Sequence, residues 1–308
     1  MENNRRLSSR KTGLWFLLAG LVLVSVLLWV GVQYRNNFYL ADVLNIRAKK
    51  AEVLSRMRAN LLKSVEAEKN AVMADTDESS LAFADQSRQA AEAMDRNRRD
   101  LVLLVEKDYS DREMKLLQEF DRCGTELREL DQTILDLAVK NTNIKAMKLS
   151  FGKGSEVVKR FEEALGDLQQ AKTSSRTDNQ IAETACKALV AGLKIHDLHA
   201  PHIVSPNDDE MDSIEARIAQ NAEGIETSLI QLKSLVPKEK LASLQEAKTA
   251  YEELMRVTKE VFDLSRQNTN VKSFELSLGR KRKITAQCDE ILISLQDTLR
   301  SKEFKATR

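Results

Sequence analysis

Proline, glycine and aromatic residues are all scarce in this sequence. Only three of its 308 residues are proline and ten are glycine, and aromatic residues make up 5%. Long stretches therefore run without a helix-breaking residue, and too few aromatic side chains are present for a typical β-sandwich or β-barrel. The chain is rich in Ala, Leu, Glu, Lys, Gln and Arg, which favour helices. We expect an all-α protein.

Cysteine is also rare, and the three cysteines lie far apart at positions 123, 186 and 288. This spacing matches neither a CxxC metal site nor the cysteine density of a disulfide scaffold. We expect Cys123 and Cys288 to be small core side chains without chemistry of their own.

Neither sign of charge prevails. The chain has 48 basic and 47 acidic residues, which are interspersed along it and leave a net charge of +1. A broad basic face is absent, so nucleic acid is not an expected partner. The one basic run, GRKRK at residues 279–283, contains no aromatic residue. We interpret it as a solvated helix face, with a phosphate-binding patch as the alternative.

Catalytic sequence motifs are missing as well. No GxSxG, GxxxxGK[ST], GxGxxG or HExxH pattern occurs, and GKGS at residues 152–155 lacks the spacing of a phosphate-binding loop. We do not expect an enzyme.

One long hydrophobic run is present. Leu14 to Val32 (LWFLLAGLVLVSVLLWVGV) are 19 residues without a charge, enough as a helix to cross a hydrocarbon layer of roughly 30 Å. Basic residues precede the run, which predicts a cytoplasmic N-terminus at residues 1–13 and a transmembrane helix at residues 14–33. A cleaved secretory signal is the alternative, but the run is long for a signal core and no convincing cleavage site follows it. We therefore expect a single-pass signal anchor in a bacterial-type inner membrane, with a periplasmic body.

The sequence also repeats itself. DLAVKNTNIKAMKLSFG at residues 136–152 and DLSRQNTNVKSFELSLG at residues 263–279 are identical at nine of seventeen positions, with an offset of 127 residues. The same register continues upstream without a gap. Duplication is the simplest account.

The repeated Asn-Thr-Asn marks a structural boundary. A heptad seam of apolar residues runs from Leu116 to Leu137, and a second seam begins at Ile144 one residue out of frame. One structure that fits is a helix reversal, in which Asn141 is left-handed and Asn143 caps the next helix. A continuous helix with a stammer is the other. We favour the reversal, with residues 152–154 as the alternative turn, and assign Asn268 and Asn270 the same structural role in the second copy.

Helix lengths suggest two tandem up-down four-helix bundles, at residues 34–172 and 173–308. Residues 173–178 (TSSRTD) form the polar joint between them. Stacked and side-by-side bundles both fit the pattern. The expected helices cover residues 36–74, 78–107, 111–140, 144–172, 179–199, 208–235, 238–267 and 271–300.

The long first helix that continues from the membrane segment, the stretch RANLLKSVEAEK at residues 58–69 and the LA…NTN boundary at residues 137–143 resemble a known family. They are similar to the four-helix-bundle ligand-binding domain of methyl-accepting chemotaxis receptors, well over residues 36–172 and more weakly over residues 179–300. The resemblance implies a periplasmic bundle that dimerises and senses small molecules. The family's cytoplasmic signalling part has no counterpart before Arg308. No motif aligns ligand-binding residues, so these stay unassigned.

All three histidines lie within nine residues, at His196, His199 and His202. On a helix the first two share a face, so the cluster could bind a divalent metal with His202 or a nearby carboxylate completing the ligands. The alternative is a favourable interaction of histidines with a helix C-terminus. The matching positions of the first copy are Lys69, Val72 and Asp75, so the cluster is not part of the repeat. No other cofactor is expected.

Two functions compete on these observations. The first is a membrane-anchored, chemoreceptor-like sensory module without an output domain of its own, which binds a small molecule or a partner receptor and dimerises through its helix seams. The second is a structural or scaffolding helical-bundle protein of the cell envelope.

Overall fold

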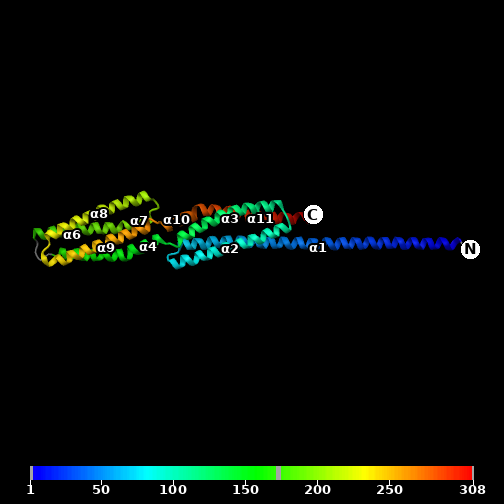
Figure 1. Ribbon diagram of the computed structural model, residues 1–308, viewed down its shortest axis with the longest axis horizontal. Coiled ribbons are helices and arrows are strands. Elements are labelled where there is room, and N and C mark those ends of the chain that lie inside the picture. Colours follow the sequence, from blue (N-terminus) through cyan, green and yellow to red (C-terminus); the bar gives the residue numbers. More distant parts are fainter. Residues whose placement is uncertain (1–2, 171–174, 307–308) are drawn as a thin grey trace. The chain divides into compact units, whose positions relative to one another are not determined.

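The computed structural model describes residues 3–170 and 175–306, with side chains placed for residues 21, 23–33, 41–170 and 175–301. Throughout these residues the chain is helical with short turns and contains no strand, which confirms the all-α prediction (Figure 1). The elements in chain order are α1 (Asn3–Met73), α2 (Asp77–Lys107), α3 (Asp111–Ala138), α4 (Thr142–Leu149), the π-helical turn η1 (Ser150–Gly154), α5 (Ser155–Gln169), α6 (Arg176–Asp197), α7 (His199–Val204), α8 (Asp208–Leu235), the 3-10 turn η2 (Lys238–Lys240), α9 (Leu241–Ser265), α10 (Thr269–Leu276), the π-helical turn η3 (Ser277–Lys281) and α11 (Arg282–Ala306).

The predicted transmembrane helix at residues 14–33 is not supported. Among the described helices, none contains a stretch that is long and apolar enough to cross a bilayer. The side chains of residues 1–20 and of Val22 lie outside the described part of the chain. The predicted domain boundary between residues 172 and 173 also lies outside the described residues.

Contacts divide the chain into two compact units. The first comprises Met1–Leu61, Glu92–Arg122 and Cys288–Arg308. Its core is formed by apolar residues such as Leu54, Leu101 and Leu117. Buried Lys50 donates hydrogen bonds to the Asp108 carbonyl and to the Glu113 carboxylate, each over 2.8 Å, and so ties the α2–α3 turn to α1.

The second unit comprises Leu62–Ala91 and Cys123–Gln287. We divide it into an insert section, residues 142–268, and a flanking section, residues 62–91, 123–141 and 269–287. The chain leaves the flanking section at Asn141 and returns to it at Asn268. The two Asn-Thr-Asn segments are therefore the two crossings between the sections.

Four helical segments build the insert section around a core that includes Phe161, Ala185, Ile225 and Leu254. These are the continuous segment α4–η1–α5, the segment α6–α7, and the helices α8 and α9. Tight packing joins α5 to α6, α6 to α8 and α5 to α9, whereas the α8–α9 side is the most open. Helix α5 thus packs with helices that the predicted division had placed in the other bundle.

Each copy of the repeat contains a π-helical turn. Ser150–Gly154 and Ser277–Lys281 are both π-helical, and their positions differ by the repeat offset of 127 residues. A π-helical turn adds one residue within an otherwise α-helical run. Residues 152–154, the alternative turn, therefore lie inside a continuous helical segment. The change of frame between Leu137 and Ile144 precedes this turn and coincides with left-handed Asn141, where the α-helix is interrupted.

Candidate functional site

The two Asn-Thr-Asn segments lie side by side and bind each other reciprocally. Thr142 donates its backbone N–H to Thr269 Oγ1 over 3.2 Å, and Thr269 donates its own to Thr142 Oγ1 over 3.3 Å. Asn141 and Asn268 have φ values of 51° and 54°. Asparagine tolerates this left-handed conformation better than most residues. The predicted left-handed position of Asn141 is confirmed.

The second asparagine of each segment caps the helix of the other segment. Asn143 donates its backbone N–H to Asn270 Oδ1 and Asn270 donates to Asn143 Oδ1, both over 3.1 Å. The first N–H groups of a helix lack intrahelical partners, so these bonds satisfy α4 and α10 mutually. The prediction that Asn143 caps the helix that follows it was wrong, because Asn143 lies within α4 and caps α10.

Side-chain amides complete the joint. Asn143 Nδ2 donates to Asn268 Oδ1 and to the Ile203 carbonyl, over 2.8 and 2.7 Å, and Asn270 Nδ2 donates to Asn141 Oδ1 over 3.0 Å. Asn141, Asn143 and Asn268 are buried, as are Ile203 and both threonines, and Asn270 is half-buried. A buried polar cluster with its partners in place favours a single arrangement of the chain. We name residues 141–143 and 268–270 the asparagine joint.

The joint also contacts the helices that border it. Asn141 Nδ2 donates to Asp77 Oδ1 over 3.1 Å, and Asn268 Nδ2 donates to the Ser205 carbonyl over 2.9 Å. Lys145 forms an ion pair with Asp77 over 2.8 Å. The Lys145 ammonium, with a smaller contribution from Asn141, lowers the pKa of the Asp77 carboxyl.

The histidines surround η1 and α9 within the insert section. His196 Nε2 lies 3.0 Å from the Ser150 carbonyl and 3.3 Å from Ser155 Oγ. A Cβ atom at Gly154 would lie 3.4 Å from the His196 ring. The imidazole therefore occupies the space beside a glycine in the π-helical turn.

His199 is fully buried and its tautomer follows from its partners. Thr258 Oγ1 donates to the Leu254 carbonyl over 2.8 Å, so it accepts from His199 Nε2 at 3.0 Å. His199 Nδ1 then accepts from Ser150 Oγ, also at 3.0 Å. Burial lowers the pKa of His199 to about 4, with smaller contributions from His196 and His202. The ring is neutral at physiological pH.

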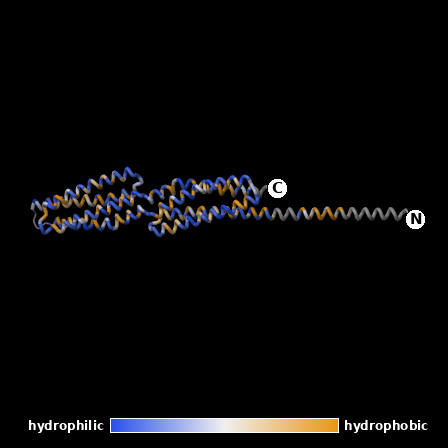
Figure 2. Tube along the Cα trace, viewed as in Figure 1, coloured by the Kyte–Doolittle hydropathy of each residue, from blue (hydrophilic) through white to orange (hydrophobic). Residues whose placement is uncertain are grey.

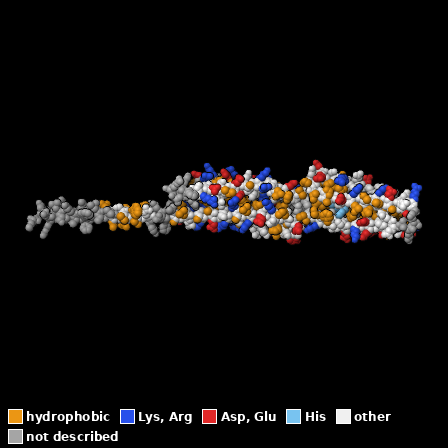
Figure 3. All heavy atoms as spheres, turned by 180° about the vertical axis from the view of Figure 1, so that it is seen from behind, with side chains coloured by type: hydrophobic (Ala, Val, Ile, Leu, Met, Phe, Trp, Pro, Cys, Tyr) orange, Lys and Arg blue, Asp and Glu red, His pale blue; other side chains and the backbone are white. Residues whose placement is uncertain are grey.

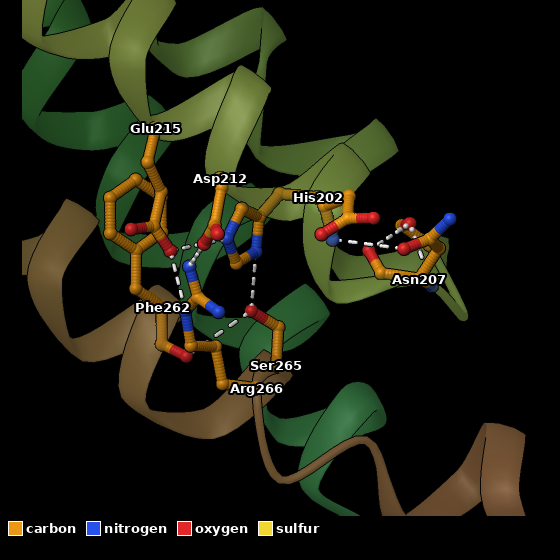
Figure 4. A network of polar contacts seen from close by, with 9 residues as sticks. His202, Asn207, Asp212, Glu215, Phe262, Ser265 and Arg266 are labelled. Carbon is orange, nitrogen blue, oxygen red and sulfur yellow. Dashed lines mark hydrogen bonds and ion pairs between the residues drawn. The ribbon is translucent and has the colours of Figure 1, made fainter.

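His202 lies in a second polar network (Figure 4). Its Nδ1 contacts Ser265 Oγ over 2.6 Å, its Nε2 contacts Glu215 Oε1 over 2.9 Å, and its ring stacks on Phe262 with a centroid distance of 4.5 Å. Burial lowers the pKa of His202, against the opposing effect of Glu215.

An arginine completes the network on the solvent side. Arg266 Nε donates to Glu215 Oε1 over 2.7 Å, and the same guanidinium pairs with Asp212. These carboxylates raise the pKa of Arg266. Hydrogen bonds from Arg266 and His202 lower the pKa of Glu215, although burial opposes them. Glu215 is therefore anionic at neutral pH.

The predicted metal ligands do not converge on one point. Each of His196, His199 and His202 has its own partners, and the rings of the first two meet edge to face at 5.5 Å. Within the described residues, no group of three or more His, Cys, Asp or Glu side chains has an arrangement that could hold a metal ion. The structure thus places these histidines in structural hydrogen-bond networks.

A buried ionic cluster lies at the other π-helical turn, in the flanking section. Lys281 is 1% exposed and pairs with fully buried Glu68 over 2.9 Å and with Asp131. The prediction that the basic run is solvated was wrong for Lys281. Glu68 Oε1 has no hydrogen-bond partner among the described residues. Burial raises the pKa of the Asp131 carboxyl, and the Lys281 ammonium opposes this only in part.

The two π-helical turns correspond through the repeat. Lys281 matches Gly154, and Asp131 matches Thr258, the partner of His199. Each turn therefore faces a buried polar cluster, ionic in one section and neutral in the other. Sequence reasoning missed the ionic cluster, because nothing local shows which face of a charged run is buried.

A cleft of about 550 Å³ lies on the open side of the insert section, between α8 and α9. This volume is within the range of small-molecule sites. The cleft is lined by Glu226, Leu229, Ile230, Lys233, Leu241, Leu244, Gln245, Lys248, Tyr251 and Glu252.

Comparisons with known proteins leave the family open. No protein-family model matches the chain, and no curated protein matches it. The chain is similar to the solved sensor domain of the V. parahaemolyticus histidine kinase sensor TorS, with 11% identity, 84% of this chain and 99% of that chain covered, and a TM-score of 0.49. It is also similar to a TorS sensor domain–TorT complex in the presence of TMAO, with 12% identity, coverage of 82% and 99%, and a TM-score of 0.44. These values assign neither a family nor a function.

Proposed function

We propose that the chain is a membrane-anchored, extracytoplasmic sensory module that binds a small molecule or a partner receptor. The observation that carries this proposal is the exposed apolar stretch of α1. Nine large apolar side chains between Leu21 and Val32 are 48% to 66% exposed. Figure 2 colours this stretch of α1 as hydrophobic. An exposed apolar stretch of this kind is unfavourable in water and favours a hydrocarbon environment, although its described part is too short to cross a bilayer.

Helix α1 connects this stretch directly to the packed body. It runs from Asn3 to Met73 as one helix, and Lys50 is its first buried side chain among the described ones. Residues 41–308, which we name the body, therefore retain every buried residue that the structure describes. Helix α1 thus joins the apolar stretch to the packed body without a break.

Disulfide chemistry supports an extracytoplasmic location. Cys123 and Cys288 are both disulfide-bonded, so the prediction that they lack chemistry was wrong. Disulfides persist mainly in oxidising compartments such as the bacterial periplasm. Cys186 is a free, exposed cysteine.

The asparagine joint suits a module that transmits a change between sections. Two chain crossings connect the insert section to the flanking section, and each caps the other. A ligand that alters the packing of the insert section would act on both crossings at once. This arrangement is compatible with the chemoreceptor-like bundle inferred from the sequence.

Labelling of Cys186 in cells tests the proposal. The full chain would be expressed in a Gram-negative bacterium and treated, before and after lysis, with a maleimide that cannot cross membranes. We expect Cys186 to react in spheroplasts without lysis, and Cys186→Ser to remove the signal. Labelling that requires lysis of the inner membrane would refute the extracytoplasmic location. Recovery of the full chain in the soluble fraction would refute the anchor.

A structural or interaction role is the second candidate, and repeated exposed apolar side chains favour it. Met147 and Phe151 are 41% and 58% exposed, and their repeat equivalents Phe274 and Leu278 are 50% and 47% exposed. Figure 3 shows hydrophobic side chains gathered over the part of the chain that carries the histidines. If these side chains join two copies, Phe151→Ser should convert a dimeric body to a monomer in sedimentation velocity. A wild-type body that is monomeric at all concentrations would exclude this homodimer.

A further inference from the structure

The α8–α9 cleft has an apolar floor. Leu229, Leu244 and the ring of Tyr251 are nearly buried there, and Ile230 stands exposed at the rim. The cleft between α6 and α8 differs, because charged and amide side chains supply most of its lining. An apolar ligand segment would therefore gain most from the α8–α9 cleft.

Two unpaired charges of opposite sign border the same cleft on α8. Glu226 accepts a hydrogen bond from Tyr251 over 3.0 Å, and within the described residues neither it nor Lys233 forms an ion pair. The other two charged residues, Lys248 and Glu252, pair with each other over 3.7 Å. Glu226 and Lys233 are thus the charges available to a ligand.

The spacing of these two charges sets the length of the ligand. They are seven residues apart on one helix, which corresponds to about 10 Å along its axis. The Tyr251–Glu226 bond places Glu226 opposite Tyr251, so Leu229 and Ile230 lie between the two charges. The cleft therefore presents an anion, an apolar middle and a cation in a line.

We propose that this cleft binds an elongated zwitterion, an ω-amino carboxylate whose ammonium group pairs with Glu226 and whose carboxylate pairs with Lys233. The hydrocarbon chain between them covers the apolar floor. Both groups also interact with water at the rim, so selectivity comes from the simultaneous fit of two charges at a fixed separation. This inference names a ligand class for the proposed sensory module, but binding itself does not depend on where the module is located.

Calorimetric titration of the purified body tests the proposal with three matched probes. These are 8-aminooctanoate, octanoate and octylamine, which share a chain length and differ in their charged ends. We expect saturable binding of 8-aminooctanoate and at least tenfold weaker binding of each singly charged probe. Equal affinity for the zwitterion and either singly charged probe, or no saturable binding of 8-aminooctanoate, would overturn the proposal.

Two variants assign the ends of the ligand. Glu226→Gln keeps an acceptor for Tyr251 but removes the charge, so 8-aminooctanoate should then bind no better than octanoate. Lys233→Gln removes the partner of the carboxylate, so 8-aminooctanoate should then bind no better than octylamine. Lys187→Gln is the control, because Lys187 lies on α6 outside the cleft and pairs with Glu183 on the surface. Unchanged selectivity in both cleft variants would refute the assignment.

The outcome is independent of the Cys186 labelling. If 8-aminooctanoate does not bind but Cys186 is labelled without lysis, the proposed ligand class is refuted and the proposed anchored module stands. If 8-aminooctanoate binds but Cys186 is labelled only after lysis, the extracytoplasmic location is refuted and the proposed binding site in the α8–α9 cleft stands.

Discussion

Asn143 and Asn270 donate their backbone N–H groups to each other's side-chain oxygens, over 3.1 Å in both directions. The residues are 127 positions apart, which is the period of the internal repeat. Each copy of the repeated segment therefore completes the helix start of the other copy. A chain with a single copy would leave its one helix start without this cap.

Asn143→Ala should destabilise the second unit. The change removes the cap of Asn270 and leaves buried acceptors on Asn268 and Ile203 without their donor. Loss of a cap costs about 1 kcal/mol, and buried groups left unsatisfied add about 1–3 kcal/mol each. Urea denaturation should show a loss of at least about 3 kcal/mol, the sum of the lower values for one cap and two unsatisfied acceptors. Asn179→Ala, at an exposed site on α6, is the control and should change stability by less than about 0.5 kcal/mol. Equal effects of the two changes would contradict the capping function.

Acid should destabilise the insert section through His199. Its pKa in the folded protein is lowered to about 4 from 6.5, so its contribution to stability is complete above pH 6.5 and is lost as the pH falls toward 4. A shift of this size corresponds to on the order of 3 kcal/mol. Buried His202 acts in the same direction. Denaturation at pH 7.0, 5.5 and 4.5 measures the slope, which should be shallower in His199→Gln because glutamine stays neutral. An unchanged slope in that variant would show that other groups cause the acid sensitivity.

Asp131→Asn should stabilise the flanking section at neutral pH. The folded pKa of Asp131 is raised, so its stabilising protonated form is present below the ordinary carboxyl pKa and is lost as the pH rises through the folded value. Asparagine stays neutral and leaves Lys281 paired with Glu68. The gain should be largest near pH 7 and should disappear near pH 3.

Lys281→Met provides the opposing variant for the same cluster. It leaves two buried carboxylates without their cation and should cost about 3–5 kcal/mol at pH 7. If Asp131→Asn and Lys281→Met both destabilise the protein at pH 7, the Asp131 carboxylate is required as an anion and the prediction for Asp131→Asn is wrong.

A pair of helical glycines tests the packing of the insert core. A Cβ atom at Gly192 would lie 2.9 Å from Cε1 of Phe161, which is fully buried, whereas a Cβ atom at Gly166 would contact nothing within 4 Å. Gly192→Ala should therefore destabilise by about 1–3 kcal/mol. Gly166→Ala should stabilise by roughly 0.5–1 kcal/mol, because alanine is the better helix former. Thermal unfolding of both variants measures the difference, and a stabilised Gly192→Ala would show that Phe161 can move aside.

Much of the helical framework was predictable from local pattern. The predicted segments 78–107 and 208–235 closely match α2 and α8, because apolar periodicity and polar breaks determine where helices begin and end. The left-handed Asn141 was predictable for a related reason, since few other residue types tolerate that conformation. The one-residue change of frame at this asparagine was also visible, whereas the π-helical turns that follow in each copy were not.

Interactions between distant segments were not predictable in the same way. The basic run at residues 279–283 alone does not show that Lys281 lies opposite Glu68, and the histidine spacing does not show that each ring has a separate partner. The α8–α9 cleft was equally hidden, because its residues follow an ordinary surface pattern on each helix.

The sequence by itself determined that the chain is helical, that it contains a duplicated segment and that each copy turns at an asparagine. These properties depend on local propensity and on the identity of short stretches. Only the tertiary structure decided that the two turns are crossings which cap each other, and that one π-helical turn faces an ionic cluster and the other faces neutral histidines. The physical reason is that an apolar stripe and the first N–H groups of a helix cannot be satisfied within that helix, which the sequence shows. Which residues satisfy them depends on the packing of the whole unit, which the sequence does not show.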